Sequence, residues 1–305
     1  MTLNKQANEA YVNYEYEKAL ALFQEAARKF RDVQSMNNLA CFIWAEEEDA
    51  EQALDLLEET MGLGAASHFP YSLMGEIYTK QGQWSKANEL LLKALTIEPT
   101  KAAYQNLAVA NYQLGYMEEA AAYFLLAADQ SDFSLYSHAK CLIEIGKKAE
   151  AIKVLDTFSE VDEEFVGAVD LADLYLEAGE KELAVLWFEK GWDHYYREPS
   201  WINRYVSALF KLERRRDAQE IIRKAIALNT VDLEEIKGQE VDEDWTISDK
   251  QEAIEEHLQK EKEYREVWNL LLSGHVPEMD FEPSYKSACY LFGCLRHNHE
   301  EYHGK

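Results

Sequence analysis

Residues 71–99 read YSLMGEIYTKQGQWSKANELLLKALTIEP, and the spacing of their apolar side chains decides the fold. Ala87, Leu91 and Ala94 follow one another at i, i+4 and i+7, which places all three on one face of a helix. Small alanines let a second helix approach closely, and the larger leucine fills the space between the two helices. Gly82, upstream of this helix, suits the left-handed residue that ends a helix. The stretch therefore predicts two antiparallel helices joined by a tight turn.

The same spacing recurs along residues 1–230 at intervals of 31 to 34 residues. Each copy has an alanine followed four positions later by a bulky apolar residue. The pairs are Ala19/Phe23, Ala53/Leu57, Ala87/Leu91, Ala120/Phe124, Ala151/Leu155, Ala184/Phe188 and Ala218/Ile222. Repeats of this length are helix pairs that bury their apolar faces against their neighbours, so the pattern predicts a solenoid.

This pattern resembles the tetratricopeptide repeat, whose motif is W-x2-L-G-x2-Y…A-x3-F…P. The resemblance implies an all-α fold, a right-handed α-solenoid superhelix of about seven helix-turn-helix repeats with capping helices at its C-terminal end. The motif is irregular in the first, fifth and seventh copies. In residues 71–99 the matching positions are Tyr71, Met74, Gly75, Tyr78, Ala87, Leu91 and Pro99.

Beyond the last copy the period stops. Residues 231–247 are rich in Asp and Glu and predict an exposed acidic loop or linker. A capping-box pattern at 248–251 begins a predicted helix that runs to about Leu272, and a last helix is expected to begin at Ser284. Because the open end of a solenoid needs a cover over its apolar face, residues 248–305 are interpreted as a C-terminal helical cap.

The composition excludes several classes of function. The formal net charge is −26, and nucleic-acid binders need Lys and Arg to displace the counterions of the phosphate backbone. The same charge disfavours anionic membrane surfaces. The first residues lack the apolar core of a signal peptide and no run of 18 apolar residues occurs, so a cytoplasmic protein without a membrane segment is expected.

No catalytic motif is found. The sequence has no phosphate-binding loop and no HExxH motif, and its many glutamates include no pair marked as acid and base, so we expect no enzyme and no cofactor. The C-terminus carries Cys289-x4-Cys294-x2-His297, followed by His299 and His303, and thiolate with imidazole suits zinc. Because Cys289 falls on the apolar face of the expected helix, a buried thiol is preferred to a metal site, and no metal is predicted.

The resemblance also implies where a partner binds. First helices of tetratricopeptide repeats line a concave groove that usually holds peptides or helices, and the residue before each inward leucine faces this groove. An asparagine there can donate to and accept from the main chain of an extended peptide, although it can also simply cap a helix or bind solvent. The predicted peptide- or protein-binding residues are Asn8, Tyr11, Asn37, Asn38, Trp44, Asn106, Tyr112, Asn203 and Phe210.

The sequence therefore favours a non-catalytic scaffold or adaptor that binds a protein or peptide segment in the repeat groove. The alternative is an acidic stoichiometric inhibitor of the immunity-protein type, which would mask a basic enzyme with its acidic surface. A regulator that senses a small peptide is a third possibility. A basic protein partner is compatible with the charge in each case, and the sequence does not identify it.

Overall fold

The computed structural model describes residues 2–130 and 132–304, and every regular element within them is helical. The prediction of an all-α solenoid of seven helix pairs is confirmed. The pairs, in chain order, are α1 (Leu3–Val12) with α2 (Tyr16–Phe30), α3 (Val33–Phe42) with α4 (Ala50–Gly62), α5 (Phe69–Lys80) with α6 (Trp84–Ile97), α7 (Lys101–Gln113) with α8 (Met117–Ala127), α9 (Phe133–Glu144) with α10 (Lys148–Leu155), α11 (Ala168–Ala178) with α12 (Lys181–Gly191), and α13 (Pro199–Lys211) with α14 (Arg215–Gly238). A short π-helical turn, η1 (Ile43–Glu47), extends α3, and α15 (Ile247–Leu272) follows the last pair.

The alanine and bulky positions of the repeat form the helix crossings. Thirteen of the fourteen paired residues are buried, and Ile222 of α14 is the exception because it is only partly covered. At the crossing of α5 and α6, a Cβ added to Gly75 would lie 2.6 Å from the Cγ atom of Leu91. Glycine is therefore needed at this point of the motif because the larger residue of the second helix occupies the space.

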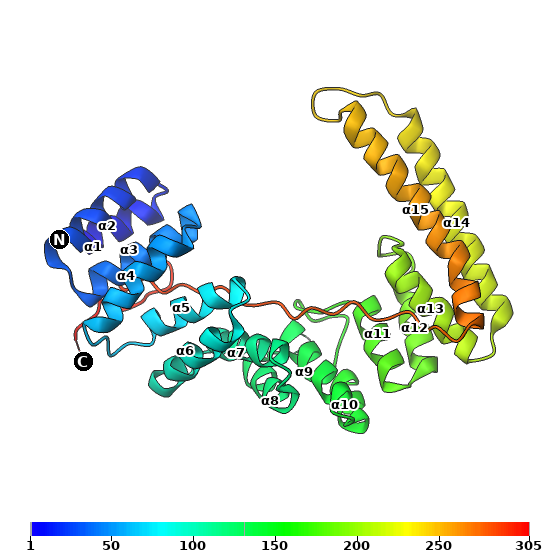
Figure 1. The fold of residues 1–305 in the computed structure, drawn as a ribbon, viewed down its shortest axis with the longest axis horizontal. Helices are drawn as coiled ribbons and strands as arrows, with labels where there is room; N and C mark the ends of the chain where they lie inside the picture. Colours follow the sequence, from blue (N-terminus) through cyan, green and yellow to red (C-terminus); the bar gives the residue numbers. More distant parts are fainter. Residues whose placement is uncertain (1, 131, 305) are drawn as a thin grey trace. The chain divides into compact units, whose positions relative to one another are not determined.

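The chain divides into two compact units, which are described separately (Figure 1). The first unit contains Met1–Asp129, Phe133–Ile145 and Pro283–Lys305, and so includes the C-terminal end of the chain. The second contains Gln130–Asp132 and Gly146–Glu282. The first unit is therefore built from the early repeats together with a segment that lies more than a hundred residues later in the sequence.

The helices at the end of the second unit differ in part from the prediction. The acidic loop expected from residue 231 begins later, because α14 continues to Gly238 with Leu233 buried. The helix predicted to end at about Leu272 is confirmed as α15, but its N-cap is Thr246, whose side chain forms a capping box with Asp249. Leu and Glu are good helix formers, and this accounts for the longer α14.

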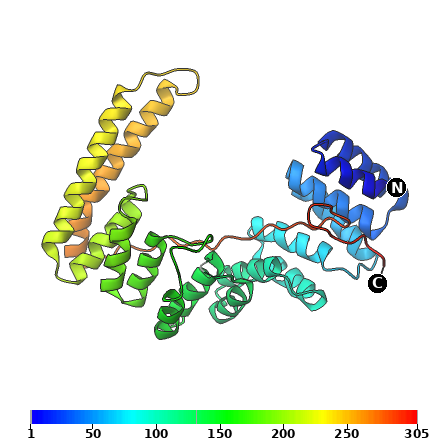
Figure 2. The ribbon, with the colours of Figure 1, turned by 180° about the vertical axis from the view of Figure 1, so that it is seen from behind.

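The helix predicted from Ser284 is wrong. Residues 281–290 carry no helical structure, and residues 291–300 form only turns. Figures 1 and 2 show this C-terminal segment, in red, as an extended chain that runs beside α5. Its backbone does not need intrahelical hydrogen bonds, because side chains of the first unit bind its N–H and C=O groups instead. We call residues 284–302 the tail segment.

Candidate functional site

Side chains of the first unit form hydrogen bonds with the main chain of the tail segment at every second residue from 284 to 292. Eight hydrogen bonds of 2.6–3.1 Å join the backbone of residues 284, 286, 288, 290 and 292 to side chains of four helices. An extended chain turns alternate residues toward the same side, so this period of two is that of a β-strand edge. The partners are Gln105 for Ser284, Asn106 for Lys286, Glu76 for Ala288, Asn37 for Tyr290, and Asn8 and Asn38 for Phe292.

The binding side chains come from the first helix of each of the first four repeats. These helices are α1, α3, α5 and α7, and the tail segment passes them in the reverse order, from α7 to α1. We call the surface formed by these helices the groove.

Two asparagines each make a paired contact with one tail residue. The Asn38 amide donates to the Phe292 carbonyl at 2.9 Å and its oxygen accepts from the Phe292 N–H at 2.8 Å. Asn106 does the same with Lys286, at 2.9 Å and 2.7 Å. Such a pair recognises the backbone of a residue and ignores its side chain.

Local structure fixes the direction of these side chains. The helix that carries Asn38, α3, is capped by Asp32, whose carboxylate accepts from the Ser35 N–H at 2.8 Å. The helix that carries Asn106, α7, is capped by Thr100, whose hydroxyl accepts from the Ala103 N–H at 3.2 Å. Caps of this kind set the start of a helix, and the start sets which positions face inward.

Glu76 provides a carboxyl acceptor in the middle of the groove. Its carboxylate accepts from the Ala288 N–H at 3.1 Å and from the Trp44 indole N–H at 3.2 Å. Burial raises the pKa of Glu76, while these two hydrogen bonds act in the opposite direction. Trp44 therefore orients the carboxylate that binds the tail segment, and Lys80 lies over its indole ring at 4.8 Å.

Apolar side chains anchor the later part of the tail segment. Tyr290, Leu291 and Phe292 are buried, whereas residues 284–288 leave their side chains exposed. The Phe69 ring of α5 stacks on Phe292 at 4.7 Å and meets Tyr290 edge to face at 6.0 Å. Burial, and next the neighbouring carboxylate in the groove, raise the pKa of the Tyr290 hydroxyl. The groove thus binds the backbone from residue 284 to residue 292 and adds aromatic side-chain contacts at Tyr290 and Phe292.

After Phe292 the chain folds into a compact loop. Gly293 has a φ of +70°, and its N–H donates to the Glu300 carbonyl at 2.9 Å. The end of the segment is fixed by Tyr302, whose N–H donates to the Gln34 side chain at 2.9 Å and whose hydroxyl accepts from the Ala66 N–H at 3.0 Å. This loop and the residues around His68 and Glu98 border a cavity of about 900 Å³.

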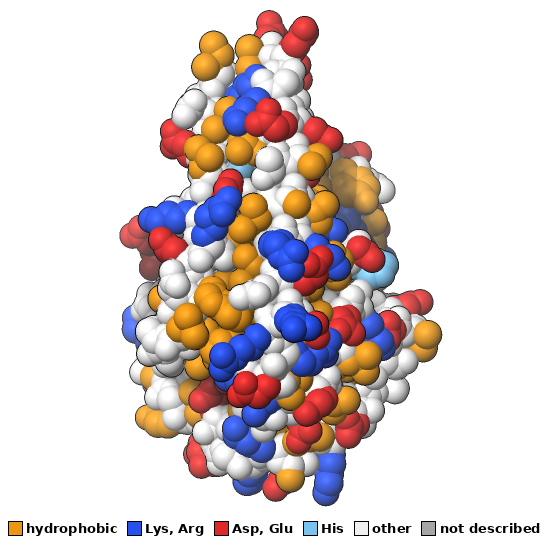
Figure 3. Space-filling model, turned by 90° about the vertical axis from the view of Figure 1, so that its right-hand side faces the viewer, with side chains coloured by type: hydrophobic (Ala, Val, Ile, Leu, Met, Phe, Trp, Pro, Cys, Tyr) orange, Lys and Arg blue, Asp and Glu red, His pale blue; other side chains and the backbone are white. Residues whose placement is uncertain are grey.

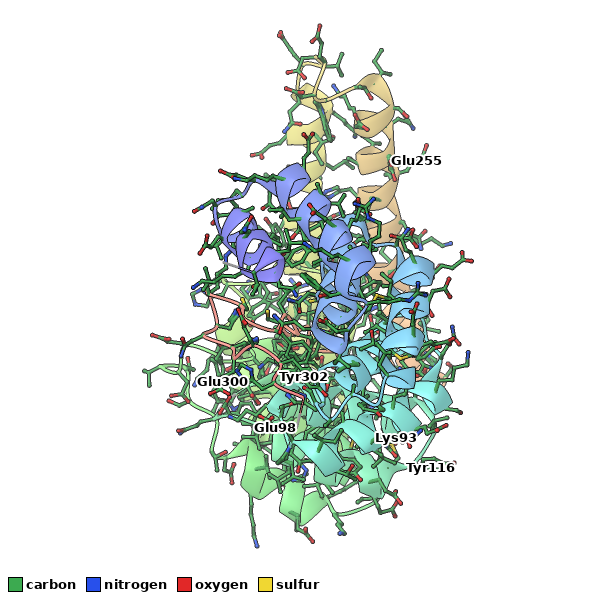
Figure 4. The ribbon with its side chains drawn as sticks, turned by 90° about the vertical axis from the view of Figure 1, so that its left-hand side faces the viewer. Lys93, Glu98, Tyr116, Glu255, Glu300 and Tyr302 are labelled. Carbon is green, nitrogen blue, oxygen red and sulfur yellow. The ribbon has the colours of Figure 1, made fainter. Side chains whose placement is uncertain are left out.

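Glu98, Glu300 and Tyr302 line this cavity and lie near one another in Figure 4. The imidazole of His68 is 3.5 Å from the Glu98 carboxylate. Burial is the largest effect on His68 and lowers its pKa, which opposes the charged form needed for an ion pair.

The remaining predicted residues lie outside the contacts with the tail backbone. Tyr11 donates its hydroxyl to Glu46, and Arg296 lies over its ring at 5.5 Å. Tyr112 packs in the core around Ala108, where burial and then Glu144 raise its pKa to about 12. Asn203 and Phe210 belong to α13 of the second unit. There the Phe210 ring meets Trp268 edge to face at 5.6 Å.

Sequence reasoning missed Gln105, Glu76 and Gln34. The repeat could have revealed the first two: Gln105 stands 68 residues after Asn37, and Glu76 stands 68 residues after Asn8. Two full repeats separate each pair, so each pair occupies equivalent helix positions. Gln34 offers no such repeat signal; its side chain accepts from the Tyr302 N–H near the end of the tail segment.

Acidic side chains do not form a continuous patch on the face shown in Figure 3, where Lys and Arg alternate with Asp and Glu. Several charged side chains of α14 and α15 are paired within their own helix, for example Arg223 with Glu220 at 2.8 Å and Arg265 with Glu261 at 2.5 Å. No helix within the described residues combines the length and apolar character needed to cross a membrane.

Comparison with known proteins agrees with this architecture. A family model described as Tetratricopeptide repeat matches residues 73–134. The C-terminal part of a TPR repeat-containing protein from Cytophaga hutchinsonii is similar in structure, with a TM-score of 0.58 and 18% identity, over 78% of this chain and 100% of that one. A tetratricopeptide repeat protein from Parabacteroides merdae has a TM-score of 0.53 and 15% identity, over 84% and 97%. No curated protein matches the sequence.

Proposed function

Because the chain is a tetratricopeptide repeat protein, we propose that it is a non-catalytic protein-binding scaffold whose groove takes an extended segment of a partner. In the absence of the partner, the tail segment occupies the groove. The observation that carries this proposal is the paired contact of Asn38 and Asn106 with the backbone of an extended chain. Such contacts accept any chain that can adopt the same path.

The tail segment indicates what the partner resembles. Its buried aromatic residues at 290 and 292 favour a partner with two bulky apolar side chains two positions apart. Residues 283–296 contain Lys286 and Arg296 but no acidic residue, in a chain of net charge −26. An uncharged or basic partner segment is therefore favoured over an acidic one. A cytoplasmic setting, in which the free thiols stay reduced, is part of the proposal.

Competition between the tail segment and the partner follows from their shared site. A tethered ligand acts at a high effective concentration, so it weakens the apparent affinity for a free peptide until it is displaced. A change that weakens the tail segment in the full chain should therefore strengthen binding of a free peptide with the intact sequence.

The test uses a fluorescent peptide of residues 284–296 and the full-length chain. A Phe292→Ala chain, whose own tail segment lacks an anchor, should bind this peptide at least about tenfold more tightly than the unchanged chain does. Adding Asn38→Ala and Asn106→Ala should weaken binding again by at least about tenfold, because hydrogen bonds to the peptide are lost. Asn111→Ala is the matched control, because Asn111 bonds only within its own helix, to the Leu107 carbonyl at 2.7 Å.

Failure of the Phe292→Ala chain to bind the peptide would reject the proposal. The same holds if the asparagine changes leave the affinity unaltered. The tail segment would then be a permanent part of the first unit.

A further inference from the structure

Two cysteines and a histidine of the tail segment converge on one point. The Sγ atoms of Cys289 and Cys294 and a ring nitrogen of His297 all lie within 4.8 Å of one another. The Cys294 Sγ is 3.4 Å from the His297 Nδ1. The chain between them makes this possible: Gly293 and Asn298 both adopt positive φ, and the His299 N–H donates to the Cys294 carbonyl at 3.0 Å.

These separations suit a tetrahedral metal ion. With zinc bonds of about 2.3 Å to sulfur and about 2.0 Å to nitrogen, the two ligand atoms lie about 3.5 Å apart. Two thiolates and an imidazole form a soft donor set, which prefers zinc to calcium or magnesium. In the metal-free chain, hydrogen bonds of Cys294 to His297, at 3.4 Å, and to Cys289 already hold the three groups together.

We propose that Cys289, Cys294 and His297 form a zinc site with three protein ligands and a fourth position open to solvent. Cys289 and His297 line the cavity described above, so the open position faces it. Further imidazoles, those of His299 and His303, line the same cavity.

The site has a consequence for the groove, and this consequence rests on the proposed function. Phe292 lies between the two cysteines in the sequence, and its carbonyl accepts hydrogen bonds from the Asn8 and Asn38 amides. A metal that joins residues 289, 294 and 297 fixes the loop in the conformation that fits the groove, which lowers the entropy lost on docking. Zinc therefore strengthens the hold of the tail segment and makes displacement by a partner harder.

Titration with cobalt(II) tests the site in the full-length, reduced, chelator-treated protein without a histidine tag. One equivalent should bind, with the absorption that thiolate ligands give to cobalt, and zinc should displace it. Cys289→Ser and Cys294→Ser should each weaken binding by at least a hundredfold, and His297→Gln by at least tenfold. Because His297 is exposed, its replacement leaves the core untouched. Cys141→Ser, at a buried cysteine of α9, should bind cobalt as the unchanged chain does.

Absence of a one-to-one complex at micromolar cobalt would overturn the site. Equal cobalt affinity of the Cys294→Ser and Cys141→Ser chains would also overturn the site. So would the finding that Cys289 and Cys294 form a disulfide with each other and bind no cobalt. Hydrogen exchange of the full chain then tests the effect on docking: amides of residues 288–300 should exchange at least tenfold more slowly with zinc. Unchanged exchange in a zinc-loaded chain would reject the effect of zinc on docking but not the zinc site, and the peptide titration above is an independent test of the groove.

Discussion

Replacement of Asn106 by alanine should release the first part of the tail segment. Both backbone groups of Lys286 are bonded to this one side chain, at 2.9 Å and 2.7 Å. Each lost hydrogen bond costs about 0.5–1.5 kcal/mol, so the two together cost about 1–3 kcal/mol. At 1.4 kcal/mol per factor of ten, the detached population should rise by about 5- to 150-fold.

Cleavage by trypsin measures the fraction of molecules in which the tail segment is detached around Lys286. The Lys286 side chain is exposed, but its backbone is bound in the groove, and a protease needs several free residues around the bond that it cleaves. At low protease, the cleavage rate follows the fraction of open molecules. Mass spectrometry of the Asn106→Ala chain should therefore show cleavage after Lys286 faster by the same factor, while cleavage after Lys93 of α6 serves as the internal reference.

Asn111→Ala is the control on the same helix, because Asn111 bonds within α7 and not to the tail segment. It should leave the rate after Lys286 unchanged. If Asn106→Ala has no effect, or if Asn111→Ala accelerates cleavage equally, the paired contact is not what holds Lys286.

Three further predictions concern packing and charge. Phe292→Ala removes a buried ring stacked at 4.7 Å and should cost about 3–5 kcal/mol of docking free energy, so hydrogen exchange should show the amides of residues 288–294 unprotected. Ala120→Leu overfills a fully buried helix crossing and should lower the free energy of unfolding by about 1–3 kcal/mol in urea, whereas Ala122→Leu on the exposed face of the same helix should not. Burial, and then a neighbouring carboxylate, raise the pKa of Asp170 from 3.8 to about 6. The folded state therefore binds the proton of the Asp170 carboxyl more tightly than the unfolded state does. The contribution of protonated Asp170 to the free energy of unfolding is lost as the pH rises from about 4 to about 6. Asp170→Asn should remove that decline; parallel pH profiles of the two chains in urea would contradict the assignment.

The sequence by itself determined the repeat and its helix crossings. Alanine and a bulky residue four positions on are a local pattern, and each repeat contacts mainly its neighbours, so the period alone predicts which faces are buried. The same logic placed Asn38 and Asn106 two repeats apart on the inward face of their helices. Their geometry depends only on positions within one helix and on its cap.

Only the tertiary structure decided what lies in the groove. The apolar periodicity after Ser284 predicted a helix. Periodicity is a local property, and it does not reveal hydrogen bonds to side chains about 180 to 280 positions earlier in the chain. The extended form prevails because amide side chains of α1, α3 and α7 and the Glu76 carboxylate of α5 satisfy its backbone, and because Phe69 packs on its aromatic side chains. The approach of Cys289, Cys294 and His297 has the same origin: in a helix from Ser284 these residues would be separated by the helical spacing, and the turn at Gly293 brings them together.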